Sequence, residues 1–312
     1  MTTLKRMTFA LMALLPMVAT PALSADGQGY ERMFIFGDSL SDPGNRFALN
    51  GETANPPFVP IPDAPYGIGG HHYSNGRTWV EVMAQQMELT EWAKPAYRNP
   101  AFGNYAYGGA RARAYSPTAP SFGDQVQAWI GAGNCTGTAM DDTLFVVQFG
   151  GNDLRDALEA YLAGQDPAPI VADAISAIVT NISILAQCGA RNVLLANAPN
   201  LGATPFVSAP YKDAVTGLSW QFNQNLQATV SLYLGGLNIS TVDFFGFVTG
   251  ATMMPEAFGF SNAATSCLAF GVVEEAFCKD RDGHLFWDAV HPTKKAHALI
   301  GEIALGQLPA PY

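Results

Sequence analysis

The sequence predicts an α/β fold in which a mostly parallel central sheet carries helices on both faces. Short apolar runs of the kind that form buried strands alternate along the chain with longer segments of helical periodicity. Some of these runs stop at glycine and polar residues, as expected where a buried parallel strand reaches the edge of its sheet. No linker or shift in composition divides the 312 residues, so we expect one domain after any targeting segment.

The first strand is expected at 33–36, an apolar run that ends at Gly37. Further strands are expected at 143–149, 191–196 and 239–244, and helices at 77–89, 121–130, 170–187, 218–234 and 293–305. The segment 42–77 is rich in proline, glycine and asparagine and is expected to be a long surface loop. An apolar lid within it is one alternative, because residues 50–70 include Phe58, Val59, Ile61 and Ile68.

The first 25 residues have the features of a cleaved export signal. Lys5 and Arg6 precede an apolar run, and small residues follow it. The run is shorter than the ~20 residues that a membrane-spanning helix needs. We therefore expect residues 1–25 to be a signal peptide, residues 26–312 to form a single domain without a membrane span, and the protein to be secreted or periplasmic.

The four cysteines are expected to form two disulfides. Their number is even and they lack C-x-x-C spacing, which in an oxidising compartment favours disulfides over a metal site. Three pairings are open. We favour Cys267–Cys278, which would close one surface loop, and this choice leaves Cys135–Cys188.

The composition indicates a large core and excludes nucleic acid as a partner. Hydrophobic residues make up 48% of the chain and charged residues 13%. The 26 acidic residues outnumber the 16 basic ones, and no run of lysine or arginine could follow a phosphate backbone. The sequence leaves the oligomeric state open.

Ser39 is the candidate nucleophile, because it directly follows the first strand, at the edge of the sheet where ligands of such folds bind. A serine hydroxyl is a weak nucleophile unless a base takes its proton. His291 is the candidate base, and Asp288, three residues earlier on the same loop, can orient its ring. These three residues are the expected catalytic set for acyl transfer.

An oxyanion formed from an ester carbonyl needs hydrogen-bond donors that are already directed at it. The candidates are the backbone N–H of Ser39, the backbone N–H of Gly109 and the side-chain amide of Asn152. Gly109 suits this role because the absence of a Cβ leaves room for the acyl group. Its neighbour Gly108 is the competing choice.

Four stretches of this chain resemble conserved blocks of the GDSL, or SGNH, serine esterase and lipase family. They are Gly37-Asp38-Ser39-Leu40-Ser41, Asn104 to Ala110, Gly150-Gly151-Asn152-Asp153 and Asp288-Ala289-Val290-His291-Pro292, in that order. The G-x-S-x-G motif of α/β-hydrolases is absent. The resemblance implies a three-layer αβα flavodoxin-like fold and ester hydrolysis without a metal or organic cofactor. It also implies Ser39 as nucleophile, His291 as base, Asp288 as its orienting acid, and Gly109 and Asn152 as oxyanion donors.

The expected substrate is a small-molecule or lipid ester with a short to medium acyl chain. Trp287, Tyr105 and Tyr107 adjoin the expected site, and aromatic rings there could hold the quaternary ammonium of a choline ester. The alternatives are a phospholipase or acyltransferase, a carbohydrate acetylesterase and, outside enzymes, an ester- or glycan-binding protein. The intact set of Ser39, Asn152, Asp288 and His291 argues against the last, because a binding protein has no need of a base aligned with a serine.

Overall fold

The computed structural model describes residues 29–51, 71–115, 119–269 and 277–311. The expected signal peptide and the four apolar residues of the suggested lid lie outside these ranges.

The central sheet consists of four parallel strands in the order β1 (Arg32–Gly37), β2 (Met140–Gln148), β3 (Ala190–Ala196) and β4 (Asn238–Val242). A short segment at Asn104 pairs in parallel with the free edge of β1 through two hydrogen bonds. Ile35 N donates to Gly103 O over 2.9 Å, and Tyr105 N donates to Ile35 O over 2.8 Å. When this segment is counted, the sheet order is 2-1-3-4-5, the flavodoxin-like order.

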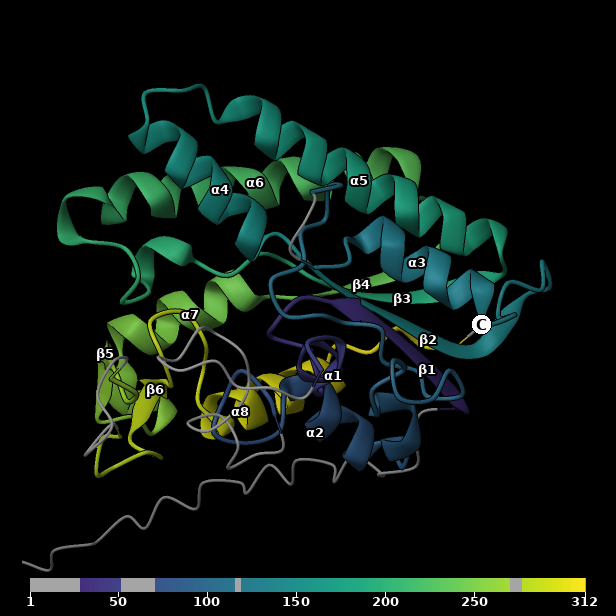
Figure 1. The fold of residues 1–312 in the computed structure, drawn as a ribbon, viewed down its shortest axis with the longest axis horizontal. Coiled ribbons are helices and arrows are strands. Elements are labelled where there is room, and N and C mark those ends of the chain that lie inside the picture. The colour runs from purple at the N-terminus through teal and green to yellow at the C-terminus, as the bar shows by residue number, and fades with distance from the viewer. Residues whose placement is uncertain (1–28, 52–70, 116–118, 270–276, 312) are drawn as a thin grey trace, which may run out of the picture.

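Helices cover both faces of the sheet, as Figure 1 shows. One face packs on α3 (Phe122–Gly131), α5 (Ala168–Gln187) and α6 (Lys212–Tyr233), with α4 (Gly151–Leu162) against α5 and α6. The other packs on α2 (Trp79–Gln86), α7 (Phe244–Met253) and α8 (Lys294–Leu305). Side chains of β1 alternate between the two cores, Phe34 and Phe36 to the first and Met33 and Ile35 to the second. The expected three-layer α/β fold is confirmed.

The remaining elements are short. They are the helix α1 (Asn45–Leu49), a two-stranded parallel sheet of β5 (Asn262–Ser266) and β6 (His284–Phe286), and the 3-10 turns η2 (Thr90–Ala93), η3 (Leu201–Ala203), η4 (Ala209–Tyr211) and η5 (Pro255–Phe258). The loop expected at 42–77 therefore contains a helix, α1.

The strand expected at 239–244 ends two residues early because Asp243 starts a helix. Its side chain accepts a hydrogen bond from Gly246 N over 2.8 Å and caps α7. Neither α7 nor α4 was expected from the sequence. The apolar residues of α7 are not confined to one stripe, so it lacks the usual amphipathic signal. The helix α4 is amphipathic, with Leu154, Ala157 and Leu158 buried on one face, but it begins at Gly151 directly after Gly150, a pair that resembles a turn.

Among the described helices, α5 is long and apolar enough to cross a membrane by length and composition. It packs against α3, α4, α6 and β3, and its inner residues lie in the core. Such packing is that of a core helix in a folded domain.

Both expected disulfides are present. Cys135 is bonded to Cys188 and Cys267 to Cys278. In the chain-entropy model, bridges across these separations of 53 and 11 residues stabilise the fold by about 4 and 3 kcal/mol.

Candidate active site

Ser39 lies in a tight turn directly after β1. Leu40 N donates to Asp38 Oδ1 over 3.0 Å, and Ser41 N donates to the Asp38 carbonyl over 3.1 Å. Before the turn, the side-chain amide of Gln125 bonds both backbone groups of Gly37, at 3.0 and 2.9 Å. The end of the strand is therefore held on α3, and Ser39 is positioned at the carboxyl edge of the sheet.

His291 and Asp288 share a compact loop after β6. Asp288 Oδ1 accepts hydrogen bonds from the backbone N–H groups of Val290 (2.9 Å) and His291 (2.8 Å). Trp287 N donates to His291 O over 2.7 Å and closes the loop. Phe206 N donates to Ala289 O over 3.0 Å, so the loop is also held from outside.

A continuous chain of hydrogen bonds joins the three candidate catalytic side chains. His291 Nδ1 lies 2.6 Å from Asp288 Oδ2, and His291 Nε2 lies 2.7 Å from Ser39 Oγ. An ionised carboxylate can only accept, so Nδ1 carries the proton and donates to Asp288. In the neutral ring Nε2 is then an acceptor for the Ser39 hydroxyl. The fold thus brings together two residues that are 252 positions apart in the sequence.

Gly109 is the third residue of a turn that starts at Tyr107. Ala110 N donates to Tyr107 O over 3.1 Å, and Gly109 has φ +80°, as the third position of a type II turn requires. A Cβ at Gly109 would meet nothing within 4 Å. At Gly108 a Cβ would lie 2.1 Å from the ring of Tyr73, and the Gly108 N–H already donates to Asp42 Oδ2 over 2.7 Å. Of the two glycines, Gly109 has the backbone N–H without a partner among the described residues.

Asn152 lies in the first turn of α4, beside the Gly109 turn. One hydrogen of its side-chain amide is donated to Ala110 O over 2.9 Å, which leaves the second hydrogen. Gly150, just before the helix, has φ +114°, and a Cβ there would lie within 3.0 Å of Phe222 and Ala198. Close packing therefore fixes the start of α4, and with it the position of Asn152.

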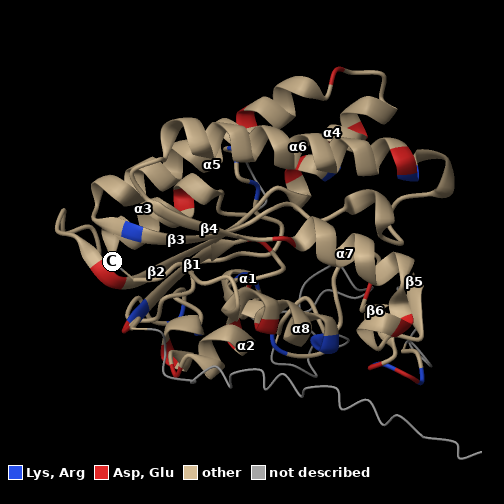
Figure 2. Ribbon diagram, turned by 180° about the vertical axis from the view of Figure 1, so that it is seen from behind, with Lys and Arg blue, Asp and Glu red and all other residues tan. Residues whose placement is uncertain are grey.

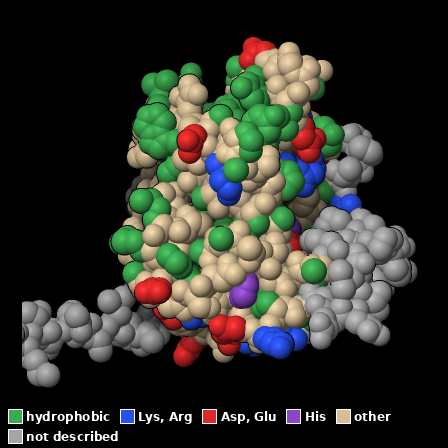
Figure 3. All heavy atoms as spheres, turned by 90° about the vertical axis from the view of Figure 1, so that its left-hand side faces the viewer, with side chains coloured by type: hydrophobic (Ala, Val, Ile, Leu, Met, Phe, Trp, Pro, Cys, Tyr) green, Lys and Arg blue, Asp and Glu red, His purple; other side chains and the backbone are tan. Residues whose placement is uncertain are grey.

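The candidate residues border a cavity of about 620 Å³ at the carboxyl ends of the strands. Its wall includes Ser39, Gly109, Asn152 and His291. Apolar and charged side chains also line it; they are Leu40, Tyr73, Tyr115, Pro199, Leu201 and Val290, with Asp38, Arg46, Arg111, Arg155 and Glu159. Figure 3 views the molecule from this end and shows basic and acidic side chains interspersed with apolar ones.

The model of the GDSL-like lipase/acylhydrolase family matches residues 33–304. The chain belongs to this family. It is 26% identical over 288 residues to the thermolabile hemolysin of Vibrio parahaemolyticus, a match that covers 87% of this chain and 62% of the hemolysin. It is 25% identical over 324 residues to a GDSL esterase/lipase of Arabidopsis thaliana, covering 87% and 86% of the two chains. The solved structure of a GDSL-like lipase from Parabacteroides merdae is 14% identical, with a TM-score of 0.48 over 89% of this chain and 96% of that one.

Membership confirms the resemblance seen in the sequence and makes the chain a carboxylic ester hydrolase that acts on ester substrates. Its two disulfides are consistent with an extracellular location.

The aromatic residues expected to contact substrate are instead core residues of this GDSL hydrolase. Trp287 is fully buried and stacks on Phe277, with ring centroids 5.3 Å apart. Tyr105 stacks on Phe36 at 5.8 Å, and Tyr107 is buried beside it. None of the three lines the described cavity. Proximity in sequence was misleading, because residues next to a site residue can point into the core.

The aromatic rings that do line the cavity are Tyr73 and Tyr115. Tyr73 packs beside His291, with ring centroids 5.2 Å apart. Tyr115 covers the guanidinium groups of Arg111 and Arg113 at 4.5 and 4.9 Å. Both residues come from loops whose course the sequence does not reveal, and no motif marks them.

Burial raises the pKa of two carboxyl groups near the nucleophile. The pKa of Asp38 is raised to about 6, mainly by burial, while hydrogen bonds from Leu40 N and Gln148 and the charge of His291 oppose the shift. The pKa of Asp42 is also raised to about 6 by burial, against backbone hydrogen bonds that include one from Gly108. Asp38 fixes the serine turn and Asp42 fixes the glycine turn, so both are structural carboxylates of the site.

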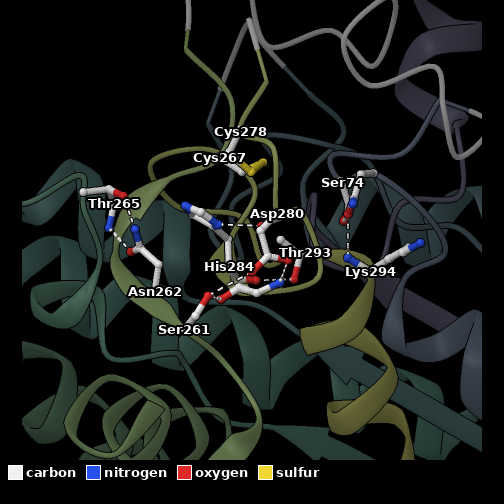
Figure 4. Close-up of a disulfide and its surroundings, with 12 residues drawn as sticks. Ser74, Ser261, Asn262, Thr265, Cys267, Cys278, Asp280, His284, Thr293 and Lys294 are labelled. Carbon is white, nitrogen blue, oxygen red and sulfur yellow. Dashed lines mark hydrogen bonds between the residues drawn. A yellow bond between two sulfur atoms is a disulfide. The ribbon is translucent and has the colours of Figure 1, made fainter. Parts of the chain in front are cut away.

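The Cys267–Cys278 disulfide lies against the loop that carries Asp288 and His291. Cys267 N donates to Phe286 O over 3.0 Å, and Leu268 N donates to Trp287 O over 2.7 Å. Figure 4 shows the disulfide above the Asp280–His284 turn, where His284 Nδ1 lies 2.8 Å from Asp280 O. His284 also lies near the two sulfurs, but the disulfide leaves no thiolate for a metal there.

Proposed function

We propose that this GDSL hydrolase is an exported serine esterase that cleaves short- to medium-chain carboxylic esters through an acyl-enzyme on Ser39. The observation that carries the proposal is the hydrogen-bond chain from Ser39 Oγ through His291 to Asp288, with lengths of 2.7 and 2.6 Å. Burial of all three side chains supports it, because each hydrogen bond is then shielded from competing water.

In the first half-reaction Ser39 Oγ attacks the ester carbonyl while His291 Nε2 takes the hydroxyl proton. Asp288 keeps the ring in the required tautomer and stabilises the imidazolium that forms. The tetrahedral intermediate collapses as His291 returns the proton to the departing alcohol, which leaves the acyl group on Ser39. Water, deprotonated by the same nitrogen, then releases the carboxylic acid.

The negative charge on the carbonyl oxygen is met by three donors. They are the backbone N–H groups of Ser39 and Gly109 and the second amide hydrogen of Asn152. Each such donor typically lowers the barrier by about 3–4 kcal/mol. Two observations support this assignment. Ser39, Gly109 and Asn152 line the same cavity, and a Cβ at Gly109 would meet nothing within 4 Å.

The composition of the cavity wall favours a neutral or anionic ester over a choline ester. Its three arginines outnumber its two acidic residues, Asp38 and Glu159, and none of the aromatic rings first expected to hold a quaternary ammonium lines it. A volume of about 620 Å³ suits a short to medium acyl chain with its alcohol. Phospholipase, acyltransferase and carbohydrate acetylesterase activity would use the same acyl-enzyme and differ in the alcohol or acceptor.

The test is hydrolysis of p-nitrophenyl esters from acetate to palmitate, beside acetylcholine, butyrylcholine and a phospholipid. The protein is compared with Ser39→Ala and with Ser183→Ala, a control on α5 outside the cavity. We expect a maximum at short to medium chains, little choline ester turnover and loss of activity in Ser39→Ala alone. A folded wild-type protein that cleaves none of these esters, or a Ser39→Ala variant with wild-type rates, would refute the proposal.

A further inference from the structure

A buried ionic network joins the segment after Gly109 to α4. Arg111 donates from Nε and Nη2 to the two carboxylate oxygens of Asp156, at 3.0 and 2.7 Å. Arg113 also donates to Asp156, and its Nε lies 3.4 Å from Asp153 Oδ1. Arg111 and Asp156 are only 7% and 8% exposed. The network is therefore largely desolvated, and its geometry is that of a bidentate guanidinium–carboxylate pair.

The same guanidinium also contacts the backbone of the oxyanion turn. Arg111 Nη1 donates to the carbonyl oxygen of Gly109 over 2.8 Å. The N–H of Gly108 is held at the other side of the turn by Asp42. The peptide that carries the Gly109 N–H thus lies between two anchored peptide groups, one held by Asp42 and one by Arg111.

Further bonds connect this segment with the first two turns of α4. Asn152 donates to Ala110 O over 2.9 Å, and Ala112 N donates to Asp153 Oδ2 over 2.9 Å. Asp156, one turn beyond Asn152, is on the same helix, so Arg111 connects the Gly109 carbonyl directly to the element that carries the amide donor. The relative position of the two donors is set by these contacts.

The free energy of burying such a network indicates that it contributes mainly to the geometry of the turn and less to the stability of the fold. A buried ion pair often gives no net stabilisation over apolar residues of similar size, because desolvation offsets the attraction. An oxyanion donor displaced by about 1 Å, by contrast, can lose on the order of 100-fold in rate. A flip of the central peptide converts a type II turn into a type I turn, and here it would reverse the direction of the Gly109 N–H.

We propose that Arg111 and Asp156 are positioning residues for the ester hydrolysis, which hold the N–H of Gly109 in register with the side-chain amide of Asn152. The inference rests on the proposed function. Asp156 does not line the cavity, and it acts through Arg111 and the turn rather than on the substrate.

The test compares Asp156→Asn and Arg111→Lys with the wild-type protein on the best p-nitrophenyl ester. Asp142→Asn is the matched control, because Asp142 pairs with Arg32 at 2.8 Å in a half-exposed pair between β1 and β2, away from the cavity. We expect kcat to fall about 10- to 100-fold in both variants with KM changed less than threefold. The inhibition constant of an alkyl trifluoromethyl ketone, whose hemiketal oxyanion needs the same donors, should rise by a similar factor.

An unchanged kcat and an unchanged inhibition constant in a folded variant would overturn the inference. A rise in KM alone would also overturn it, because the network would then only shape the substrate site. Arg111→Lys keeps the buried charge and decides the question if Asp156→Asn fails to fold. If the wild-type protein hydrolyses no ester, both proposals fail. If Ser39→Ala abolishes hydrolysis while Asp156→Asn and Arg111→Lys retain wild-type rates, only the proposal for Arg111 and Asp156 fails.

Discussion

At the scale of single residues, the proposed mechanism makes the reactivity of Ser39 depend on one proton of His291. Asp288 accepts from His291 Nδ1 and, through its other oxygen, from two backbone N–H groups of the same loop. One carboxylate therefore sets both the tautomer of the ring and the shape of the loop. This double role explains why the acid needs to be only three residues from the base.

Replacing Asp288 by asparagine should lower kcat by about 10⁴-fold, because an amide can donate to Nδ1 and so stabilise the wrong tautomer. Asp282→Asn is the control, since Asp282 lies on the exposed turn before β6, 3.5 Å from Lys294. Steady-state kinetics on a p-nitrophenyl ester would measure the effect. A kcat within tenfold of wild type in folded Asp288→Asn would contradict the role given to Asp288.

The raised pKa of Asp38 predicts that the free energy of unfolding depends on pH. Its pKa is raised by burial to about 6 in the folded protein, above the unfolded value of about 3.9, so the folded state binds more protons between these values. Its contribution to stability is therefore fully present below about pH 4 and is lost as the pH rises through 6. Asp38→Asn should remove this loss, which is on the order of 3 kcal/mol.

The measurement is urea unfolding of wild type and Asp38→Asn at several pH values from 4 to 7. The wild-type free energy of unfolding should fall relative to that of the variant as the pH increases. Parallel curves would show that Asp38 has the same pKa in the folded and unfolded states.

At the scale of elements, the two disulfides act on different ends of the sheet. Cys267 N donates to Phe286 O, and the next residue, Leu268, donates from its N–H to Trp287 O, directly before Asp288. Cys135–Cys188 joins the segment between α3 and β2 to the end of α5, where Gly137 N donates to Cys188 O over 3.1 Å. That end of the sheet is opposite the cavity.

Removing each bridge by paired serine substitutions should therefore separate stability from activity. The Cys135/Cys188 variant should lose about 4 kcal/mol and keep its kcat well below its melting temperature. The Cys267/Cys278 variant should lose about 3 kcal/mol and also show a reduced kcat, because the Asp288–His291 loop loses its support. Thermal melting and kinetics at low temperature would measure both. Equal effects on kcat would contradict this division.

The elements also show what sequence patterns can and cannot predict. The strands at Phe34, Val146 and Leu194 were recognisable because both of their faces are buried and their sequences are apolar throughout. The helix α4 was missed because Gly150 and Gly151 resemble a turn, although its apolar residues form one face that packs on α5 and α6. In such a helix tertiary contacts outweigh local preference.

At the scale of the whole molecule, parallel strands bring distant segments to one edge. The sequence allowed Ser39, Asn152 and His291 to be grouped in advance, because each lies in a recognisable motif that follows a strand. It did not allow this for Tyr73 and Tyr115, because the paths of their loops decide where these rings lie. The structure was also needed to show which of the two glycines has an N–H without a partner among the described residues, and to reveal the Arg111–Asp156 network. Charges are scattered over the described helices, without a basic face, as Figure 2 shows for the side away from Figure 1.

The central claim is that Ser39 carries the acyl group during turnover. Mixing the protein with a p-nitrophenyl ester, quenching in acid and analysing peptides by mass spectrometry tests it directly. We expect one acyl group on the peptide that contains Ser39, a matching burst of p-nitrophenol, and neither in Ser39→Ala. Acylation of another residue, or turnover that persists in Ser39→Ala, would contradict the account.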